Sequence, residues 1–298
     1  MEKISCQSVI YDFNEVHEPI KKIPSGTTLE ISTYDCFENQ IQSENTEISA
    51  LDWDRVNPAT GPIYVLGAEV GDVLKVKIEK LEIGEQGVMV VGPNLGVMGH
   101  RFIDMKAKII PIKNGKAMFN DLELPLNPMI GVIGVAPAGA GVTCGTPGAH
   151  GGNMDNKMVT EGVTMYFPVF VEGALFGLGD FHAAMGDGEI SVSGIEVPGK
   201  ATVTLEVLKG KSLQEPMLEN DEVVTQIASA KTLDEAAKLA TELMIDQLVE
   251  LTEMSIEEVT MLMSAVGQVE VCQIVDPLIT ARFVVPKWLL KQLNVSFF

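Results

Sequence analysis

Apolar and polar residues alternate in short runs through the chain up to about residue 209. Residues 72–80 give the clearest example, because Leu74, Val76 and Ile78 fall on one face of an extended chain and charged residues fall on the other. Clusters of glycine, proline and asparagine separate these runs. Each such strand has one apolar face to bury, so we expect a mainly β body built as a β-sandwich or a distorted barrel.

Residues 189–207 contain two further runs with the period of a strand. Ile190 and Val192 alternate with serines, the phase changes at Gly194, and Pro198 begins a proline-glycine turn signal. The pattern predicts a β-hairpin with a bulge at Gly194 and a turn at Pro198.

A helical period replaces the strand period in the last part of the chain. Thr232 is followed by Glu235, and Ser255 is followed by Glu258. Each pair has the spacing of a capping box and precedes a stripe of apolar residues at helical intervals. The sequence therefore predicts two helices, of which the second ends near Gly267.

Two strand-like runs follow these helices, at residues 269–275 and 280–285, and Pro286 can open a last short helix. We therefore divide the chain into a β-rich body at residues 1–210, which we expect to carry the active site, and an α+β segment at residues 211–298, which packs on that body.

Acidic residues outnumber basic ones: 41 Asp and Glu against 21 Lys and Arg give a formal net charge of −20 over 298 residues. This charge repels phosphate backbones and anionic lipids, so we expect neither nucleic acid nor a membrane as a partner. The N-terminal residues lack the apolar stretch of a signal peptide, which indicates a cytoplasmic protein. The four cysteines form no CxxC pair, so we expect reduced thiols.

Two glycine-rich segments concentrate the residues that could carry chemistry. GTPGAHGGNMDNK contains His150, Asn153 and Asp155, and GLGDFHAAMGDGE contains Asp180, His182, Asp187 and Glu189. Imidazole together with carboxylate oxygen suits Zn²⁺, whereas a site richer in oxygen suits Ca²⁺ or Mg²⁺. The neighbouring glycines let the backbone approach an ion or a small ligand closely.

Each of these residues also has a structural explanation. Asn153 and Asp187 are common turn residues, and His150 fits a surface loop. Cys144 has only His150 as a base nearby in the sequence, and no GxSxG pattern is present, so a covalent nucleophile is disfavoured.

Longer segments of the chain are distinctive as whole motifs: DCFENQI from Asp35, NPATGPIYVLGAEVGDVLKV from Asn57, GTPGAHGGNMDNK from Gly145 and PVFVEGALFGLGDFHAAMGDGE from Pro168. They resemble the acetamidase/formamidase family, and the resemblance extends from about residue 4 to VDPLITARFVVPK near the C-terminus. The resemblance implies a mainly β, cytoplasmic enzyme that hydrolyses short aliphatic amides to a carboxylate and ammonia. It also implies a metal site in at least some members and a homo-oligomer, for which we favour a dimer.

The histidine and carboxylate cluster and the resemblance together predict amide hydrolysis by metal-activated water. The expected cofactor is a divalent metal, zinc and/or calcium, with these ligands: Asn153, Asp155, Asp180 and His182. Proton transfer is assigned to Glu189 or Asp187, with His182 as the base if it is not a ligand. Binding of the small amide substrate is assigned to His150, Gly151 and Gly152.

Two other functions stay open. Members of the family often carry a glutamate shortly after the Ala136-Pro137-Ala138 sequence, where this chain reads GAGVTCG. A member that binds a metal and a small ligand without turnover is therefore the first alternative. The second is a carbohydrate-binding β-sandwich with a structural cation, although two tryptophans and four tyrosines are few for stacking on sugars.

Overall fold

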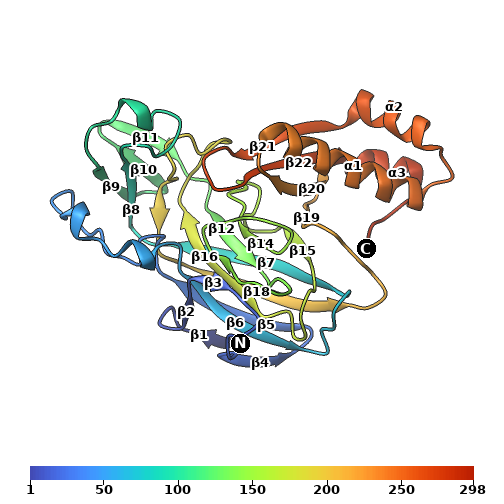
Figure 1. Ribbon diagram of the computed structural model, residues 1–298, viewed down its shortest axis with the longest axis horizontal. Coiled ribbons are helices and arrows are strands. Elements are labelled where there is room, and N and C mark those ends of the chain that lie inside the picture. The colour runs from blue at the N-terminus through green and yellow to red at the C-terminus, as the bar shows by residue number, and fades with distance from the viewer.

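The computed structural model describes residues 1–298, apart from the side chain of Ser49. Within this described chain, two large sheets form the body (Figure 1). The first sheet has nine strands, which lie in this order: β1 (Glu2–Ile4), β5 (Thr27–Thr33), β18 (Gly199–Leu208), β7 (Val73–Ile83), β15 (Thr164–Pro168), β19 (Met217–Glu219), β20 (Val223–Ala230), β22 (Ile279–Pro286) and β21 (Gln268–Gln273).

The second sheet has 11 strands. Eight follow one another in this order: β11 (Leu122–Pro125), β10 (Lys116–Phe119), β9 (Lys106–Lys113), β8 (Gln86–Val91), β17 (Glu196–Val197), β16 (Phe176–His182), β12 (Met129–Gly134) and β14 (Gly151–Asn153). β6 (Ala59–Leu66) also pairs with β16, and β2 (Val9–Ile10) and β4 (Lys21–Pro24) pair with β6. β3 (Asp12–Phe13) and β13 (Val142–Thr143) form a separate pair.

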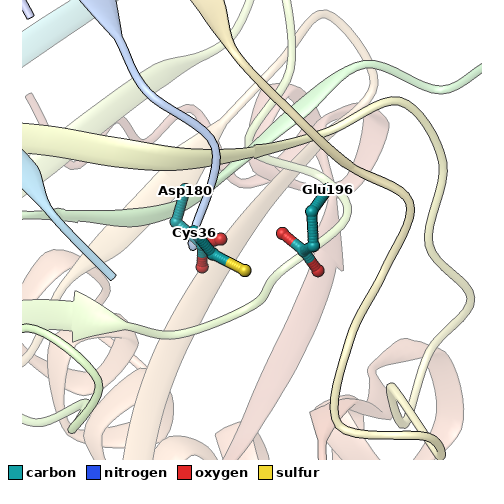
Figure 2. Close-up of side chains that lie close together, drawn as sticks. All are labelled: Cys36, Asp180 and Glu196. Atoms are coloured by element: carbon teal, nitrogen blue, oxygen red, sulfur yellow. The ribbon is translucent and has the colours of Figure 1, made fainter. Parts of the chain in front are cut away.

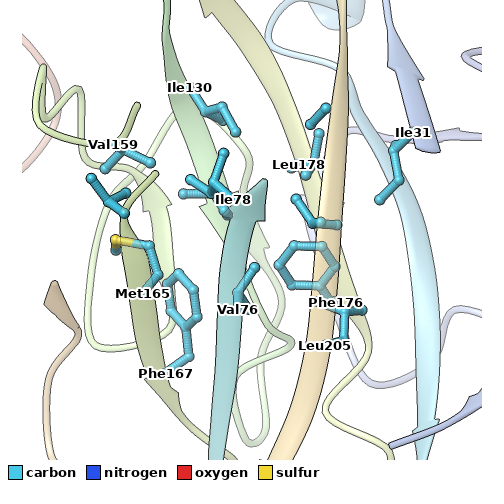
Figure 3. Packing of buried hydrophobic residues seen from close by; sticks show 14 of the residues in the cluster. Ile31, Val76, Ile78, Ile130, Val159, Met165, Phe167, Phe176, Leu178 and Leu205 are labelled. Atoms are coloured by element: carbon cyan, nitrogen blue, oxygen red, sulfur yellow. The ribbon is translucent and has the colours of Figure 1, made fainter. Parts of the chain in front are cut away.

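The main hydrophobic core lies between these two sheets (Figure 3). Val76 and Ile78 of β7 contribute from the nine-stranded sheet, and Ile130 of β12 and Leu178 of β16 contribute from the other. Alternate residues of β7 are buried, as the sequence pattern predicts, because one face of the strand meets this core. The prediction of a mainly β fold with sheet-on-sheet packing is confirmed.

The helices lie in the C-terminal segment: α1 (Leu233–Leu251), α2 (Ile256–Val266) and α3 (Lys287–Leu293). Both predicted capping boxes are present, at Thr232 with Glu235 and at Ser255 with Glu258. α2 ends before Gly267, and Pro286 precedes α3, as predicted. Short 3-10 helices occur at Ile48–Ala50, Trp53–Arg55 and Gly99–Arg101.

The nine-stranded sheet is continuous from the body into the C-terminal segment, because β15 pairs with β19. β20, β22 and β21 then extend the sheet, and α1 packs on β20 and β22. The division at residue 210 stays a prediction. No helix in the described part of the chain is long and apolar enough to cross a membrane.

The predicted hairpin at residues 189–207 is wrong. Only its second strand, β18, forms as expected, and β17 belongs to the other sheet, where it pairs with β16 and β8. The chain therefore changes sheets at Pro198, which is how sandwiches turn their corners. Before β17 the chain follows a turn, in which Glu189 and Val192 have left-handed φ angles of 45° and 72°.

Candidate metal centre

β16 and β17 bring the first polar residues of the site together. Asp180 and His182 are two positions apart on β16 and therefore share one face of the sheet. His182 lies directly opposite Glu196 of β17 in the strand register. All three side chains are at least nine-tenths buried, in the centre of the 11-stranded sheet.

Four carboxylates surround the imidazole of His182. Its Nε2 atom lies 3.1 Å from Glu196 Oε2 and 3.4 Å from Asp180 Oδ1. Asp155 Oδ1 is 3.7 Å away, and Glu189 Oε1 is 3.9 Å away. Even so, neither ring nitrogen of His182 has a hydrogen bond, and the facing oxygens of Asp155, Asp180 and Glu196 also have none among the described residues.

Strained loops carry part of this cluster. Asp155 follows β14, and Glu189 follows the loop after β16. Asp155, Asp180 and Glu189 have φ angles of 41°, 55° and 45°, in the left-handed region that non-glycine residues rarely adopt. Such strain is common at binding sites, where the surrounding structure holds the residue in place.

Two glycines make room for the cluster. A Cβ atom on Gly131 of β12 would lie 2.4 Å from Asp155 Oδ1 and 2.6 Å from Asp180 Oδ2. A Cβ atom on Gly194 would lie 2.5 Å from His182 Nδ1. A larger residue at either position would displace the cluster.

A second group of potential ligands adjoins the first. Cys36, Asp180 and Glu196 are all buried and have ligand atoms within 4.8 Å of one another. Figure 2 shows the sulfur of Cys36 and the carboxylates of Asp180 and Glu196 directed toward a common point. Asp35 holds this turn in place, because its Oδ1 atom accepts hydrogen bonds from the backbone N–H groups of Phe37 and Asn39 at 2.9 and 2.7 Å.

A cavity of about 140 Å³ opens over these groups. Polar side chains from distant parts of the chain form one part of its lining: Cys36, Asn57, Asn153, Asp180, Glu189, Glu196 and Asp276. Apolar side chains form the other part: Phe37, Trp53, Val56, Val90, Leu95 and Val192. The cavity is small and is lined by both polar and apolar side chains, so it suits a small polar molecule with a short alkyl group.

Charge and burial strongly affect the titration of the site. Burial raises the pKa of Asp155 well above its ordinary value, and the charge of Asp180 raises it further. Burial together with the charge of Asp155 does the same for the pKa of Glu189. Burial by itself would lower the pKa of His182, but the charges of Glu196 and Asp180 raise it well above 6.5.

The donor set fits a divalent cation. Nitrogen and oxygen ligands of a tetrahedral zinc ion, at about 2.0–2.1 Å from the metal, lie about 3.3 Å from one another. The four carboxylate oxygens lie 3.1–3.9 Å from His182 Nε2, and most of these atoms have no hydrogen bond. Among the described residues, no lysine or arginine forms an ion pair with Asp155, Asp180, Glu189 or Glu196. A bound cation would supply both the missing partners and the missing positive charge.

The sequence model of the acetamidase/formamidase family matches residues 7–143 and 139–276, and so covers most of the chain. The chain belongs to this family. The resemblance inferred from the sequence motifs is therefore confirmed.

Solved structures and curated proteins of this family are similar to the chain. A structure from Thermoanaerobacter tengcongensis, described as a predicted acetamidase/formamidase, is 49% identical, covers 99% of each chain and has a TM-score of 0.98. The acetamidase from Bacillus halodurans is 44% identical over 98% of this chain and 100% of its own, with a TM-score of 0.96. A protein of Schizosaccharomyces pombe named as a formamidase is 25% identical over 251 residues, which are 63% of this chain and 61% of that relative's length.

Most of the residues assigned from the sequence of this family member meet at the cavity. Asp180 and Glu189 line it, His182 contacts both of them, and Asp155 contacts His182. Asn153 also lines it, with its Nδ2 atom donating to Asp276 Oδ2 at 3.1 Å and its buried Oδ1 atom without a partner. The individual roles of these residues stay predictions.

His150, Gly151 and Gly152 do not line this cavity. The buried ring of His150 packs edge-on against Phe13 at 5.3 Å between ring centroids, and burial lowers the pKa of His150 to about 4. Gly151 and Gly152 pair with β12, and a Cβ atom on Gly152 would lie 2.4 Å from the carbonyl oxygen of Thr146. Close packing of the backbone therefore accounts for these glycines, and substrate binding by the three residues stays a prediction.

Asp187 also lies apart from the cluster. It forms a bidentate ion pair with Arg282 at 3.0 Å and a second ion pair with Lys157 at 2.7 Å. The exposed loop at residues 138–141, where the family glutamate is missing, is likewise outside the cavity lining. Cys144 is fully buried, and burial raises the pKa of its thiol, which agrees with the low expectation for a nucleophile.

Three further residues of the site escaped the sequence analysis: Cys36, Glu196 and Asp276. Glu196 has a visible signal, because it is a carboxylate within a short apolar run between Gly194 and Pro198. Cys36 and Asp276 lie in segments that resemble the family, DCFENQI and VDPLITARFVVPK, but neither segment by itself indicates a ligand. Only the fold brings them to β16.

Proposed function

We propose that this protein hydrolyses short aliphatic amides, such as formamide and acetamide, to a carboxylate and ammonia. The observation that carries the proposal is the buried cluster of His182 with four carboxylates, three of which have an oxygen without a hydrogen-bond partner among the described residues, beside a small cavity in a chain of the acetamidase/formamidase family. The names of its relatives, acetamidase and formamidase, support the same substrate class.

The residues that would hold a divalent cation are His182 and the three acids Asp155, Asp180 and Glu196, whose oxygens lie 3.1–3.7 Å from His182 Nε2. When bound, such a cation polarises a carbonyl group and lowers the pKa of a coordinated water toward about 7. The nitrogen and oxygen donors favour zinc for this group. Calcium is the second candidate, because the neighbouring carboxylates and Asn153 are rich in oxygen.

The lining of the cavity orients the substrate. Phe37, Leu95 and Val192 offer apolar contacts to a short alkyl group. The free Oδ1 atom of Asn153 can accept a hydrogen bond from the amide nitrogen of the substrate, because its own Nδ2 atom is held by Asp276. A volume of about 140 Å³ leaves room for formamide or acetamide but excludes long-chain amides.

Glu189 is the residue best placed for proton transfer. It lines the cavity, and its Oε1 atom is the most distant of the four carboxylate oxygens from His182 Nε2. A carboxylate at this place can take a proton from the attacking water and deliver it to the departing nitrogen, which cannot leave as an amide anion. Asp187 is less suited to this role, because Arg282 and Lys157 occupy its carboxylate.

The test combines metal analysis with ammonia release from a panel of short amides. We expect the purified protein to contain a stoichiometric divalent cation and to lose activity after dialysis against a chelator. His182→Gln should lose both cation and activity, whereas Glu215→Gln, which changes a half-buried carboxyl outside the cavity, should keep both.

Each contrary result has a defined meaning. Full activity in metal-free protein would exclude the proposed mechanism. A cation retained by His182→Gln with activity lost would make His182 a base rather than a ligand. A bound cation without ammonia from any amide would favour the family member that binds without turnover.

A further inference from the structure

Arg282 is the largest of the fully buried side chains and comes from the C-terminal segment, on β22. Its side chain is 1% exposed, although the guanidinium carries a permanent charge. Glu270 of the neighbouring strand β21 accepts from Nε at 2.8 Å and offsets part of this charge. The remaining donors point toward two loops of the β body.

The first of these contacts reaches the loop that carries Asp155. Arg282 Nη1 donates to Asn156 Oδ1 at 3.0 Å, and Asn156 is fully buried. Asn156 directly follows Asp155, whose left-handed backbone needs support from its surroundings. A fixed Asn156 side chain therefore limits how far the carboxylate of Asp155 can move.

The second contact reaches the loop that carries Glu189. Both oxygens of Asp187 accept from Arg282, at 3.0 Å each, in the planar bidentate arrangement that only arginine supplies. The same loop is tied to β21 by the backbone, where Gly188 N–H donates to the carbonyl oxygen of Cys272 at 2.8 Å. Glu189 is two residues beyond Asp187 and lies in the buried cluster.

We propose that Arg282 is a positioning residue for the metal centre. Its guanidinium holds the loops of Asp155 and Glu189 at a fixed separation. It thereby fixes the positions of two of the four carboxylates around His182. The proposal rests on the cation site of the proposed function but requires no role of Arg282 in the reaction itself. It also gives the C-terminal segment a function, because that segment supplies the residue that aligns the site.

Arg282→Lys is the sharpest test, because lysine keeps the positive charge but cannot form the fork that reaches Asn156 and Asp187 together. We expect the affinity for Zn²⁺, measured by calorimetric titration of cation-free protein, to fall about 10–100-fold, as it does when residues supporting metal ligands are changed. In cation-free protein, the backbone amides of residues 153–157 and 186–189 should exchange hydrogen faster than in wild type.

Glu270→Gln is the matched control, because Glu270 contacts the same guanidinium, at Nε and Nη2, but belongs to β21 and to neither loop. It should lower the melting temperature but leave Zn²⁺ affinity within about twofold and exchange in both loops unchanged. Equal losses of affinity in the two variants, or an Arg282→Lys protein with wild-type affinity and exchange, would overturn the proposal.

A double-mutant cycle with Asp187→Asn separates the two contacts. If Arg282 acts partly through Asp187, Arg282→Lys should lower the Zn²⁺ affinity less in the Asp187→Asn variant than in the wild-type protein. Independent, additive losses would contradict that contact. If Arg282→Lys does not fold, Asp187→Asn alone tests whether Arg282 fixes the loop that carries Glu189. Faster hydrogen exchange of the backbone amides at residues 186–189 would support this role, and unchanged exchange would contradict it.

The outcome remains distinguishable from failure of the proposed function. A wild-type protein that binds Zn²⁺ without releasing ammonia would refute amide hydrolysis but leave the affinity comparison intact. A wild-type protein that binds no divalent cation would refute the metal centre, and the exchange rates of the two loops would still show whether Arg282 fixes them.

Discussion

Two charged clusters lie side by side in this protein and are interleaved in its sequence. Asp155 and Glu189 belong to the proposed metal centre around His182, whereas their near neighbours Lys157 and Asp187 belong to the cluster around Arg282. The Arg282 cluster is balanced, because each of its carboxylates contacts a basic side chain. The metal centre has four carboxylates around one imidazole.

The difference shows which cluster has a partner within the chain for each of its buried charges. Buried charges are stable only when they have partners, and the Arg282 cluster supplies its own. The proposed metal centre keeps unpaired oxygens at Asp155, Asp180 and Glu196 among the described residues, and the proposed cation would be their partner. Loss of charge should therefore have opposite effects on the stability of the two clusters.

The largest expected effect is that of Asp180→Asn. In cation-free protein the substitution removes a buried carboxylate that repels Asp155 and Glu189, so the melting temperature should rise, by roughly 2–4 °C for each kcal/mol of relieved repulsion that exceeds the lost attraction to His182. With a divalent cation added, the same variant should be less stable than wild type and lose about 100-fold or more of its ammonia-releasing activity.

Thermal melting with chelator and with added Zn²⁺ measures this reversal of sign. A variant that is destabilised under both conditions would mean that Asp180 has a structural role, and that the metal centre is no less balanced than the Arg282 cluster.

Asp187→Asn should have a smaller effect on stability, and it should be destabilising both with and without a bound cation. It removes a bidentate charge partner from the buried Arg282 guanidinium, and the free energy of unfolding should fall by about 1–3 kcal/mol. Urea denaturation should give a loss of stability with chelator present as well as absent. A stabilised cation-free variant would contradict the view that this cluster is complete without a ligand.

Glu215 sharpens the comparison as a half-buried carboxyl that has no ion-pair partner among the described residues. Its Oε2 atom has no hydrogen bond, and burial raises its pKa from 4.5 to about 8. A carboxyl with a raised folded-state pKa contributes stability that is complete below about pH 4.5 and is lost as the pH rises through about 8.

Glu215→Gln should therefore flatten the pH dependence of unfolding between these values, by on the order of 1–2 kcal/mol because the side chain is partly exposed to solvent. Denaturation series at about pH 5, 7 and 9 would measure how the free energy of unfolding changes with pH. Identical slopes in wild type and variant would show that Glu215 keeps an ordinary pKa in the folded protein.

The local sequence pattern was sufficient to predict the secondary structure of segments that bury a single face. The alternation in β7 and the capping boxes of α1 and α2 depend on residues a few positions apart, and all were predicted. The hairpin prediction failed because Glu196 and Val197 are buried in the other sheet, and alternation along the chain does not say which sheet a strand joins.

The candidate site divides in the same way. The sequence groups Asp180 with His182 because both lie in one glycine-rich segment, but only the structure places them on one face of β16. Asp187 looked equivalent to Glu189, and no local feature shows that a strand almost a hundred residues later provides Arg282 as the partner of Asp187. Glu196, Cys36 and Asp276 reach the cavity from separate elements.

The sequence alone determined the β character of the body, the helices of the C-terminal segment, the family, and the two glycine-rich segments that supply three of the four carboxylates around His182. Tertiary structure decided which acids face His182 and which face Arg282. The physical reason is that the partner of a buried charge is set by strand register and by contacts between distant elements, whereas chain periodicity fixes only the face on which each side chain lies.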